Sequence, residues 1–394
     1  MMFDTGKKVR NYVILSYLVF WLMVLGICGT ASMVFHCSAT VMRVLSNLCA
    51  WSPTIVLLAG FKYFCPGMTV RGTVCDLSLD CRRDMFIGSQ RGTVLMIRLN
   101  DYLKERFGEK IYRLSLTSGC TCPNRDGRIG FGGCTFCSEG GSGEFAAAPA
   151  PIDIQIEEAK RLIQKKTDAK KYIAYFQAYS NTYGDIDRLK KLYRDVLERD
   201  DIVALSLGTR PDCLGNEVMA ALSELNDIKP VWIELGLQTV HDSTAKRFRR
   251  GYKLSVFENA YGNLKKAGIE VIVHVIFNLP GETREDMLET VKYLSRLSPK
   301  IDGVKLHILQ ILEGTELSLE YGREPFPIMS LDEYADLIAE SISILPEKTV
   351  LHRMTGDGPR KLLIAPLWSL DKKRVLNTIN KRVNENRPND LHMV

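Results

Sequence analysis

The sequence predicts an α/β fold in which six parallel strands form a partial TIM-like barrel, with a C-terminal helical or extended appendage and a hydrophobic N-terminal segment. From Ile111 onward, short apolar runs alternate with amphipathic stretches, a pattern typical of strands joined by crossover helices. The chain has 394 residues, 46% of them hydrophobic, so one large barrel domain can bury its core. The expected strands are Tyr112–Leu116, Tyr172–Phe176, Ile202–Leu207, Val231–Leu235, Glu270–Phe277 and Gly303–Ile308.

Helical periodicity fills the intervals between these strands. Thr283 predicts the start of one helix, because its side chain can cap the helix and Asp286 stands at the third helical position. Parallel strands present their carboxyl ends at one edge of a barrel, and we expect the reactive groups there. The expected helices are Ile154–Lys166, Ile186–Glu198, Asn216–Leu225, Val256–Ala267, Arg284–Leu297, Leu331–Ile344 and Leu370–Val383.

We divide the chain into a hydrophobic segment (1–95), a barrel core (96–345) and an extension that packs on the barrel (346–394). The first 95 residues hold nine Lys and Arg against four acidic residues, whereas the other 299 hold 43 basic and 42 acidic residues. The formal charge of +6 therefore arises mainly from the N-terminal segment and indicates neither a nucleic-acid partner nor its absence.

The N-terminal segment contains two apolar stretches. Residues 12–35 are uncharged and long enough to span a bilayer, and residues 44–64 form a weaker stretch. Three interpretations stay open: a membrane anchor, an upstream translation followed by a start at Met96, and a cleaved targeting peptide. If the segment is genuine, we expect a two-span hairpin, because it keeps the body of the protein in the reducing cytoplasm.

Four of the eleven cysteines lie within eighteen residues, directly after the first expected strand: Cys120, Cys122, Cys134 and Cys137. The same loop holds five glycines, which suit a backbone that wraps closely around an inorganic centre. Thiolates are the usual ligands of iron–sulfur clusters, and three of them leave one iron of a cube open. A four-cysteine structural zinc site fits the spacing equally well. The position at a strand's carboxyl end favours the cluster.

Six motifs follow one another along the body. The first joins Cys122-Pro-Asn-Arg-Asp-Gly to Gly-Gly-Cys134-Thr-Phe-Cys137, a C-x11-C-x2-C pattern. The others are Tyr172-Ile-Ala-Tyr-Phe-Gln-Ala-Tyr-Ser-Asn-Thr, Gly208-Thr-Arg-Pro-Asp-Cys213, Glu234-Leu-Gly-Leu-Gln-Thr239, Asn278-Leu-Pro-Gly-Glu-Thr283 and Ala365-Pro-Leu-Trp368. With these motifs, residues 99–368 resemble the YhcC-type radical S-adenosylmethionine (SAM) proteins, relatives of the Elongator catalytic subunit.

The resemblance implies a 4Fe-4S cluster on Cys122, Cys134 and Cys137, with Cys120 as a neighbour and not a ligand. It implies that the open iron binds SAM and that the reduced cluster cleaves SAM to a 5′-deoxyadenosyl radical. A reductant protein such as flavodoxin or ferredoxin would supply the electron. The SAM-binding residues that it implies are Gln177, Ser180 and Asn181 for the methionine end, and Asn278, Pro280 and Gly281 for the adenine.

Three polar residues at later strand ends are candidates for catalysis. A carboxylate in an apolar strand is costly unless it is used or paired, which favours a role for Glu234, followed by Gln238 near the end of the same strand. Arg210 can bind a carboxylate or phosphate, or form an ion pair with Asp212. His274, Lys305, His307 and His352 also stand in or beside apolar runs and are expected to line the barrel interior.

The resulting function is a radical SAM enzyme acting on an unidentified substrate, for which kinship with the Elongator subunit makes tRNA one candidate. Two other classes stay open at this point. A zinc-stabilised α/β binding protein would contain zinc and perform no radical chemistry. A membrane-tethered scaffold would keep its function after the substitution Cys134→Ala.

Overall fold

The computed structural model of the protein describes residues 96–385 except 142, 144, 166 and 357. The interpretations of residues 1–95, including the two apolar stretches, therefore lie outside the described residues. Within the described part of the chain, no helix is both long and apolar enough to cross a bilayer.

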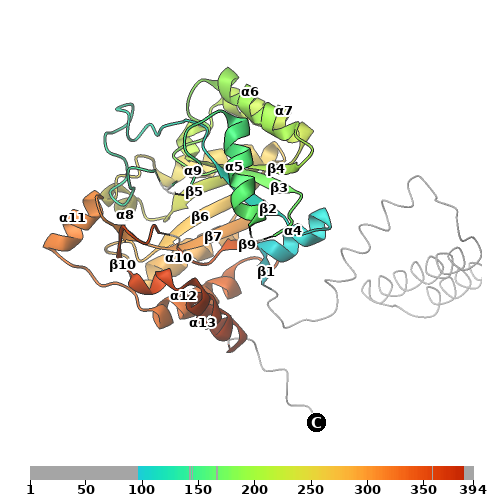
Figure 1. Cartoon of the computed structure of the whole chain (residues 1–394). Helices are drawn as coiled ribbons and strands as arrows, with labels where there is room; N and C mark the ends of the chain where they lie inside the picture. Colours follow the sequence, from blue (N-terminus) through green and yellow to red (C-terminus); the bar gives the residue numbers. More distant parts are fainter. Residues whose placement is uncertain (1–95, 142, 144, 166, 357, 386–394) are drawn as a thin grey trace, which may run out of the picture. The chain divides into compact units, whose positions relative to one another are not determined.

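Eight strands form one curved, wholly parallel sheet (Figure 1). The six expected strands are confirmed, and two of them, β4 and β5, extend two or three residues further than expected. The sequence analysis missed β9 and β1, which are short and extend the sheet beyond β7. In spatial order the strands are β1 (Ile97–Arg98), β9 (Val350–Arg353), β7 (Gly303–Ile308), β6 (Glu270–Phe277), β5 (Val231–Gln238), β4 (Ile202–Thr209), β3 (Tyr172–Phe176) and β2 (Tyr112–Leu116).

The seven expected helices are present, with ends within three residues of those expected. Thr283 caps α10 as predicted, in a reciprocal capping box with Asp286. The short elements α4, α8, α11, β8 (Ile311–Leu312) and β10 (Leu363–Ala365) escaped prediction because each offers too few residues for a period to show. The helices are α4 (Leu99–Phe107), α5 (Ile152–Gln164), α6 (Ile186–Leu197), α7 (Asn216–Ile228), α8 (Asp242–Arg247), α9 (Leu254–Lys266), α10 (Arg284–Arg296), α11 (Glu316–Arg323), α12 (Leu331–Ile344) and α13 (Lys372–Glu385).

Each face of the sheet contributes to a separate apolar cluster. Alternate residues such as Ile233 and Leu235 of β5 pack with the helices in the main core. On the inner face, Trp232 of β5 belongs to a second apolar cluster that includes Leu99 and Leu103 of α4. This second cluster, which we call the apolar floor, holds residues near the amino-terminal ends of the strands. It leaves the opposite, carboxyl edge of the inner face for the functional groups.

Candidate active site

The loop between β2 and α5 carries the clustered cysteines and is shaped by its own backbone hydrogen bonds. The amide of Arg125 donates to the Cys122 carbonyl at 2.8 Å, and the amide of Cys137 donates to the Cys134 carbonyl at 2.9 Å. Gly133 has φ of 87°, and a Cβ there would lie 2.8 Å from Arg125 Nε. Only glycine avoids both the strain and the collision at this position.

The loop is anchored to two distant segments. Asn124 Nδ2 donates to the carbonyl of Arg249 at 2.6 Å, and the amide of Thr135 donates to the carbonyl of Phe248 at 3.1 Å. The Thr135 carbonyl in turn accepts from the amide of Leu317 in α11, at 2.8 Å. Asn124 Nδ2 also lies 3.6 Å from Cys134 Sγ. The cysteines are therefore held in place before any ligand arrives.

Cys122, Cys134 and Cys137 are half-buried, and their charges influence one another. Burial, together with the neighbouring Cys137 and Cys122, raises the pKa of the Cys134 thiol to about 12, while Arg210 opposes them. Three thiolates in one loop repel one another, and a bound cation removes that repulsion. The donor set thus fits a thiolate-bound metal centre.

Zinc and an iron–sulfur cluster need different spacings between the ligating sulfur atoms. Among the described residues, no three cysteines have sulfur atoms within 4.8 Å of one another. A single tetrahedral zinc ion with bonds of about 2.3 Å would hold its sulfurs only about 3.8 Å apart. A four-iron cube places each ligand on a different iron and needs a wider spread.

Cys120 has different surroundings. Its thiol is 8% exposed, belongs to the main apolar core and lies 3.8 Å from Arg188 Nη2. The side chain of Arg188 also donates to the Ser118 carbonyl at 2.9 Å, which fixes the start of the loop. Cys120 thus packs in the core, and its exclusion from the ligands stays a prediction.

Asn181 is fully buried where the chain leaves β3. Both the nitrogen and the oxygen of its side-chain amide form hydrogen bonds. Nδ2 donates to the carbonyls of Phe176 and Gly208 at 3.0 and 2.9 Å, while Oδ1 accepts from Ser118 Oγ at 2.6 Å. These contacts join the ends of β3 and β4 to the start of the cysteine loop.

The other two residues expected at the methionine end of SAM are less constrained. Ser180 is 1% exposed, and its hydroxyl lies beside the Cys213 thiol without a well-formed hydrogen bond to any described residue. Gln177 is half-buried at the carboxyl end of β3. A buried hydroxyl without a hydrogen-bond partner, so close to the cysteine loop, is typical of a site that a ligand completes.

The segment expected near the adenine follows β6. Asn278 has φ of 65°, and its side chain holds the chain after α11, accepting from the Met329 amide at 2.7 Å. Pro280 is buried and lines a pocket with Phe136 of the cysteine loop. Gly281 has φ of 90°, so a side chain there would be strained. The structure thus brings two of the predicted SAM segments to the same edge.

Arg210 follows β4 and points toward the cysteine loop. It forms a two-pronged ion pair with Asp212, at 2.9 and 2.7 Å, and stacks 4.9 Å from the Tyr252 ring centre. Burial lowers the pKa of Arg210, but Asp212 outweighs burial and raises it. The expected alternative, an ion pair with Asp212, is therefore present. It leaves a permanent positive charge near Cys122 and Cys134.

Gln238 ends β5 with φ of 63°, which is uncommon for a residue other than glycine. Its Oε1 accepts from the Tyr252 hydroxyl at 3.1 Å. Tyr179, Arg249 and Asn278 share this backbone conformation, and all border the strand ends or the anchor of the cysteine loop. Such strain gathers at functional sites.

Glu234 lies deeper in the barrel, 1% exposed, and accepts four hydrogen bonds. Oε2 accepts from the Tyr175 hydroxyl at 3.0 Å, from His274 Nε2 at 2.9 Å and from Lys305 Nζ, while Oε1 accepts from Ser206 Oγ at 3.0 Å. Together with Arg113, whose guanidinium lies 5.3 Å from the Tyr175 ring centre, these six residues form what we call the polar layer.

The surroundings within the polar layer shift the pKa values of Glu234 and Lys305. Burial by itself would raise the pKa of Glu234, but Lys305 and His274 hold it well below its ordinary value. Burial, together with Arg113 and Arg353, lowers the pKa of Lys305 to about 7, although Glu234 opposes them. The carboxylate thus stays charged, while Lys305 is able to exchange a proton near neutral pH.

The structure brings together Glu234, His274 and Lys305, which the sequence had offered separately. The centre of the His307 ring lies 5.4 Å from that of His274, with the two rings tilted by 45°, and His352 packs edge-on against Trp232 instead. Sequence reasoning missed three members of the layer: Arg113, Tyr175 and Ser206. Tyr175 and Ser206 stand at the inward positions of β3 and β4, a signal that strand alternation could have supplied.

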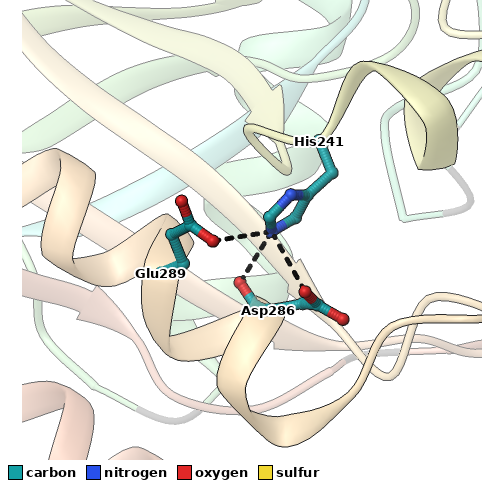
Figure 2. A group of neighbouring side chains, drawn as sticks. All are labelled: His241, Asp286 and Glu289. Carbon is teal, nitrogen blue, oxygen red and sulfur yellow. Dashed lines mark hydrogen bonds and ion pairs between the residues drawn. The ribbon is translucent and has the colours of Figure 1, made fainter.

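A further cluster of His241, Asp286 and Glu289 lies at the junction of α8 and α10 (Figure 2). Nε2 of the histidine ring lies near three oxygen atoms. These are the Asp286 carbonyl oxygen at 3.0 Å, the Asp286 carboxylate at 3.9 Å and the Glu289 carboxylate at 4.0 Å. A carbonyl accepts only from a protonated nitrogen, so Nε2 has no lone pair left for a metal. We interpret the cluster as a clamp between the two helices.

Comparison with known proteins defines the family. The Radical SAM superfamily model matches residues 120–294, and the Radical SAM C-terminal domain model matches residues 301–385. The chain belongs to the radical SAM superfamily, whose members are enzymes that use SAM and a 4Fe-4S cluster. Within it, the chain is of the YhcC type. It is 42% identical over 290 residues to an uncharacterized protein of Bacillus subtilis, YtqA, covering 73% of this chain and 89% of that protein.

Other relatives agree. Protein YhcC of Escherichia coli K12 is 34% identical over 284 residues, with 72% of this chain and 90% of YhcC covered. Elongator complex protein 3 of Danio rerio is 26% identical over 163 residues, which is 41% of this chain and 29% of that protein. The solved structure of Methanocaldococcus infernus Elp3 with residues 1–46 deleted superposes with a TM-score of 0.53 at 18% identity, covering 69% of this chain and 63% of that one. This likeness confirms the partial-barrel fold.

Proposed function

We propose that the protein binds a 4Fe-4S cluster through Cys122, Cys134 and Cys137 and uses it to cleave SAM reductively, so that a 5′-deoxyadenosyl radical acts on an unidentified substrate. One observation carries the proposal. Three cysteines, whose thiolates would repel one another, stand on a pre-shaped loop at the carboxyl edge of the barrel, while Cys120 packs in the core. The reduced cluster supplies the electron for breaking the sulfur–carbon bond of SAM.

The residues of this chain supply placement and charge. Asn124 positions Cys134 from 3.6 Å and the neighbouring Arg210 carries a permanent positive charge, both of which stabilise the thiolates. We assign Ser180 and Gln177 to the methionine end of SAM, and Asn278, Pro280 and Gly281 to shaping the wall beside its adenine. Asn181 serves the same site by fixing the strand ends.

Beyond SAM, we assign Glu234 and its partners to the substrate side of the reaction, because they line the barrel below the cysteine loop. Gln238 and Arg210 lie between these two regions. We also propose an electron donor such as flavodoxin or ferredoxin, and a cytoplasmic location for the catalytic body.

The direct test is anaerobic reconstitution of the full chain with iron and sulfide. We expect about four irons and four sulfides per chain and formation of 5′-deoxyadenosine from SAM with dithionite. Cys120→Ala is the matched control and should keep both properties. A colourless protein that binds one zinc ion and releases no 5′-deoxyadenosine would instead establish the zinc-stabilised binding protein.

The substrate needs a separate experiment. A relative in Methanocaldococcus jannaschii, described as a tRNA uridine(34) acetyltransferase, is 27% identical over 163 residues, or 30% of its length. This makes tRNA a candidate that we propose to test by comparing modified nucleosides from cells with and without the gene. Identical nucleoside profiles would exclude a tRNA product.

A further inference from the structure

The polar layer is closed at one end and open to solvent at another. Below it, toward the amino ends of the strands, the apolar floor joins Trp232 to residues of α4 and β9. The layer is nevertheless not sealed, because the His274 side chain is 21% exposed. A ligand can therefore reach the layer, while the apolar floor covers its amino-terminal side.

The layer has more positive than negative charge. Arg113 and Lys305 lie 5.3 and 4.6 Å from the centre of the same Tyr175 ring. Glu234 already accepts four hydrogen bonds, and it is the one acidic group among the charges that act most strongly on Lys305. Among the six residues of the layer itself, the one carboxylate, Glu234, therefore stands beside two basic side chains, Arg113 and Lys305.

Two buried nitrogen atoms at this level also lack hydrogen-bond partners among the described residues. Arg113 forms no ion pair with any described residue, and its Nη1 is buried without a hydrogen bond. His307 Nε2 is likewise buried and unpaired within the described part of the chain. Leaving a buried guanidinium nitrogen unpaired is costly, and such groups commonly mark a site that a ligand completes.

We propose that the polar layer binds an oxyanion of a small-molecule substrate, a carboxylate or a phosphate, through Arg113 and Lys305. The planar fork of Arg113 matches either oxyanion, and Lys305 supplies a point charge across the Tyr175 ring. The bound anion would balance the excess charge and satisfy Arg113 Nη1. This inference rests on the proposed function, because it assigns the layer to the substrate of the radical reaction.

The test measures binding of inorganic phosphate and of malonate to the cluster-loaded full chain by calorimetry, without SAM or reductant. We expect one of the two probes to bind, and Arg113→Gln to weaken it about tenfold or more. Arg113→Lys keeps the charge without the fork and should bind with intermediate affinity. The matched control is Arg161→Gln, on the exposed face of α5, which should change the affinity less than about twofold. Circular dichroism establishes that each variant is folded.

Several outcomes would overturn the proposal. These are equal affinity in wild type and Arg113→Gln, equal weakening by Arg161→Gln, or competition between malonate and SAM for the same site. Binding of a tRNA transcript that depends on Arg113, with neither probe bound, would assign the layer to RNA instead. Formation of 5′-deoxyadenosine by the wild type is measured separately, so a failure of the radical function and a failure of anion binding are distinguishable.

Discussion

The cysteine loop and the polar layer of the barrel differ in the signs of the charges that they bring together. The loop gathers like charges from a short stretch of chain, Cys122 to Cys137, at the half-buried edge. The layer gathers opposite charges from strands far apart in sequence and buries them, with Lys305 0% and Glu234 1% exposed. Three thiolates in the loop would therefore need a cation from outside, whereas in the layer Glu234 and Lys305 pair with each other. The two regions should accordingly fail in different ways when they are altered.

The largest effect is expected in the loop. Replacing Cys122, Cys134 or Cys137 by Ala removes one of three ligands, and we expect nearly complete loss of iron, sulfide and the brown absorbance after anaerobic reconstitution. Because the loop is held by backbone bonds, far-ultraviolet circular dichroism should change little. Retention of the cluster in Cys134→Ala together with its loss in Cys120→Ala would reassign the ligands.

The second-largest effect is expected at the ion pair of Glu234 and Lys305 in the polar layer. Glu234→Gln leaves Lys305 and its neighbours without a buried counter-charge, and should lower the free energy of unfolding in urea by about 3–5 kcal/mol. The double variant Glu234→Gln with Lys305→Met removes both charges and should be more stable than Glu234→Gln alone. A double variant that loses the sum of both single effects would show that the two residues act independently.

A smaller effect tests the junction between the regions. Asn181→Ala leaves carbonyls at the ends of β3 and β4 without their amide donor, and we expect a loss of about 2–3 kcal/mol in unfolding free energy. If Asn181 acted only by binding SAM, SAM affinity would fall while stability stayed unchanged. Urea unfolding and equilibrium binding of SAM, measured on the same variant, separate the two roles.

The smallest effect is a pH dependence of stability. Lys305 has a folded-state pKa of about 7, below its ordinary 10.5, so between these values the unfolded chain binds more protons than the folded one. The contribution of Lys305 to stability should therefore rise with pH from about 7.5 to 9.5, by at most about 1.4 kcal/mol per pH unit. The measurement is the stability difference between wild type and Lys305→Met at several pH values. A stability difference that does not change with pH would show that the folded-state pKa of Lys305 is not near 7.

Strand positions and the cysteine loop were predictable because each leaves a local pattern. The runs from Tyr112, Tyr172 and Glu270 were expected with the same bounds that the structure has. Thr283 and Asp286 predicted the start of α10, since a capping box needs only four consecutive residues. The short elements α8 and β9 could not be predicted, because tertiary packing, and not periodicity, stabilises them.

By itself, the sequence determined the order of strands and helices and the edge at which the cysteines stand, because these depend on periodicity and on chain direction. It offered Glu234, His274 and Lys305 only as separate polar residues in apolar strands. The tertiary structure decided that Glu234 bonds Ser206, His274, Tyr175 and Lys305, which are 28 to 71 residues away along the chain. Such partners are fixed by strand register and barrel curvature, which bring distant side chains to one level. That is also why Arg113 and its unpaired nitrogen emerged only from the fold.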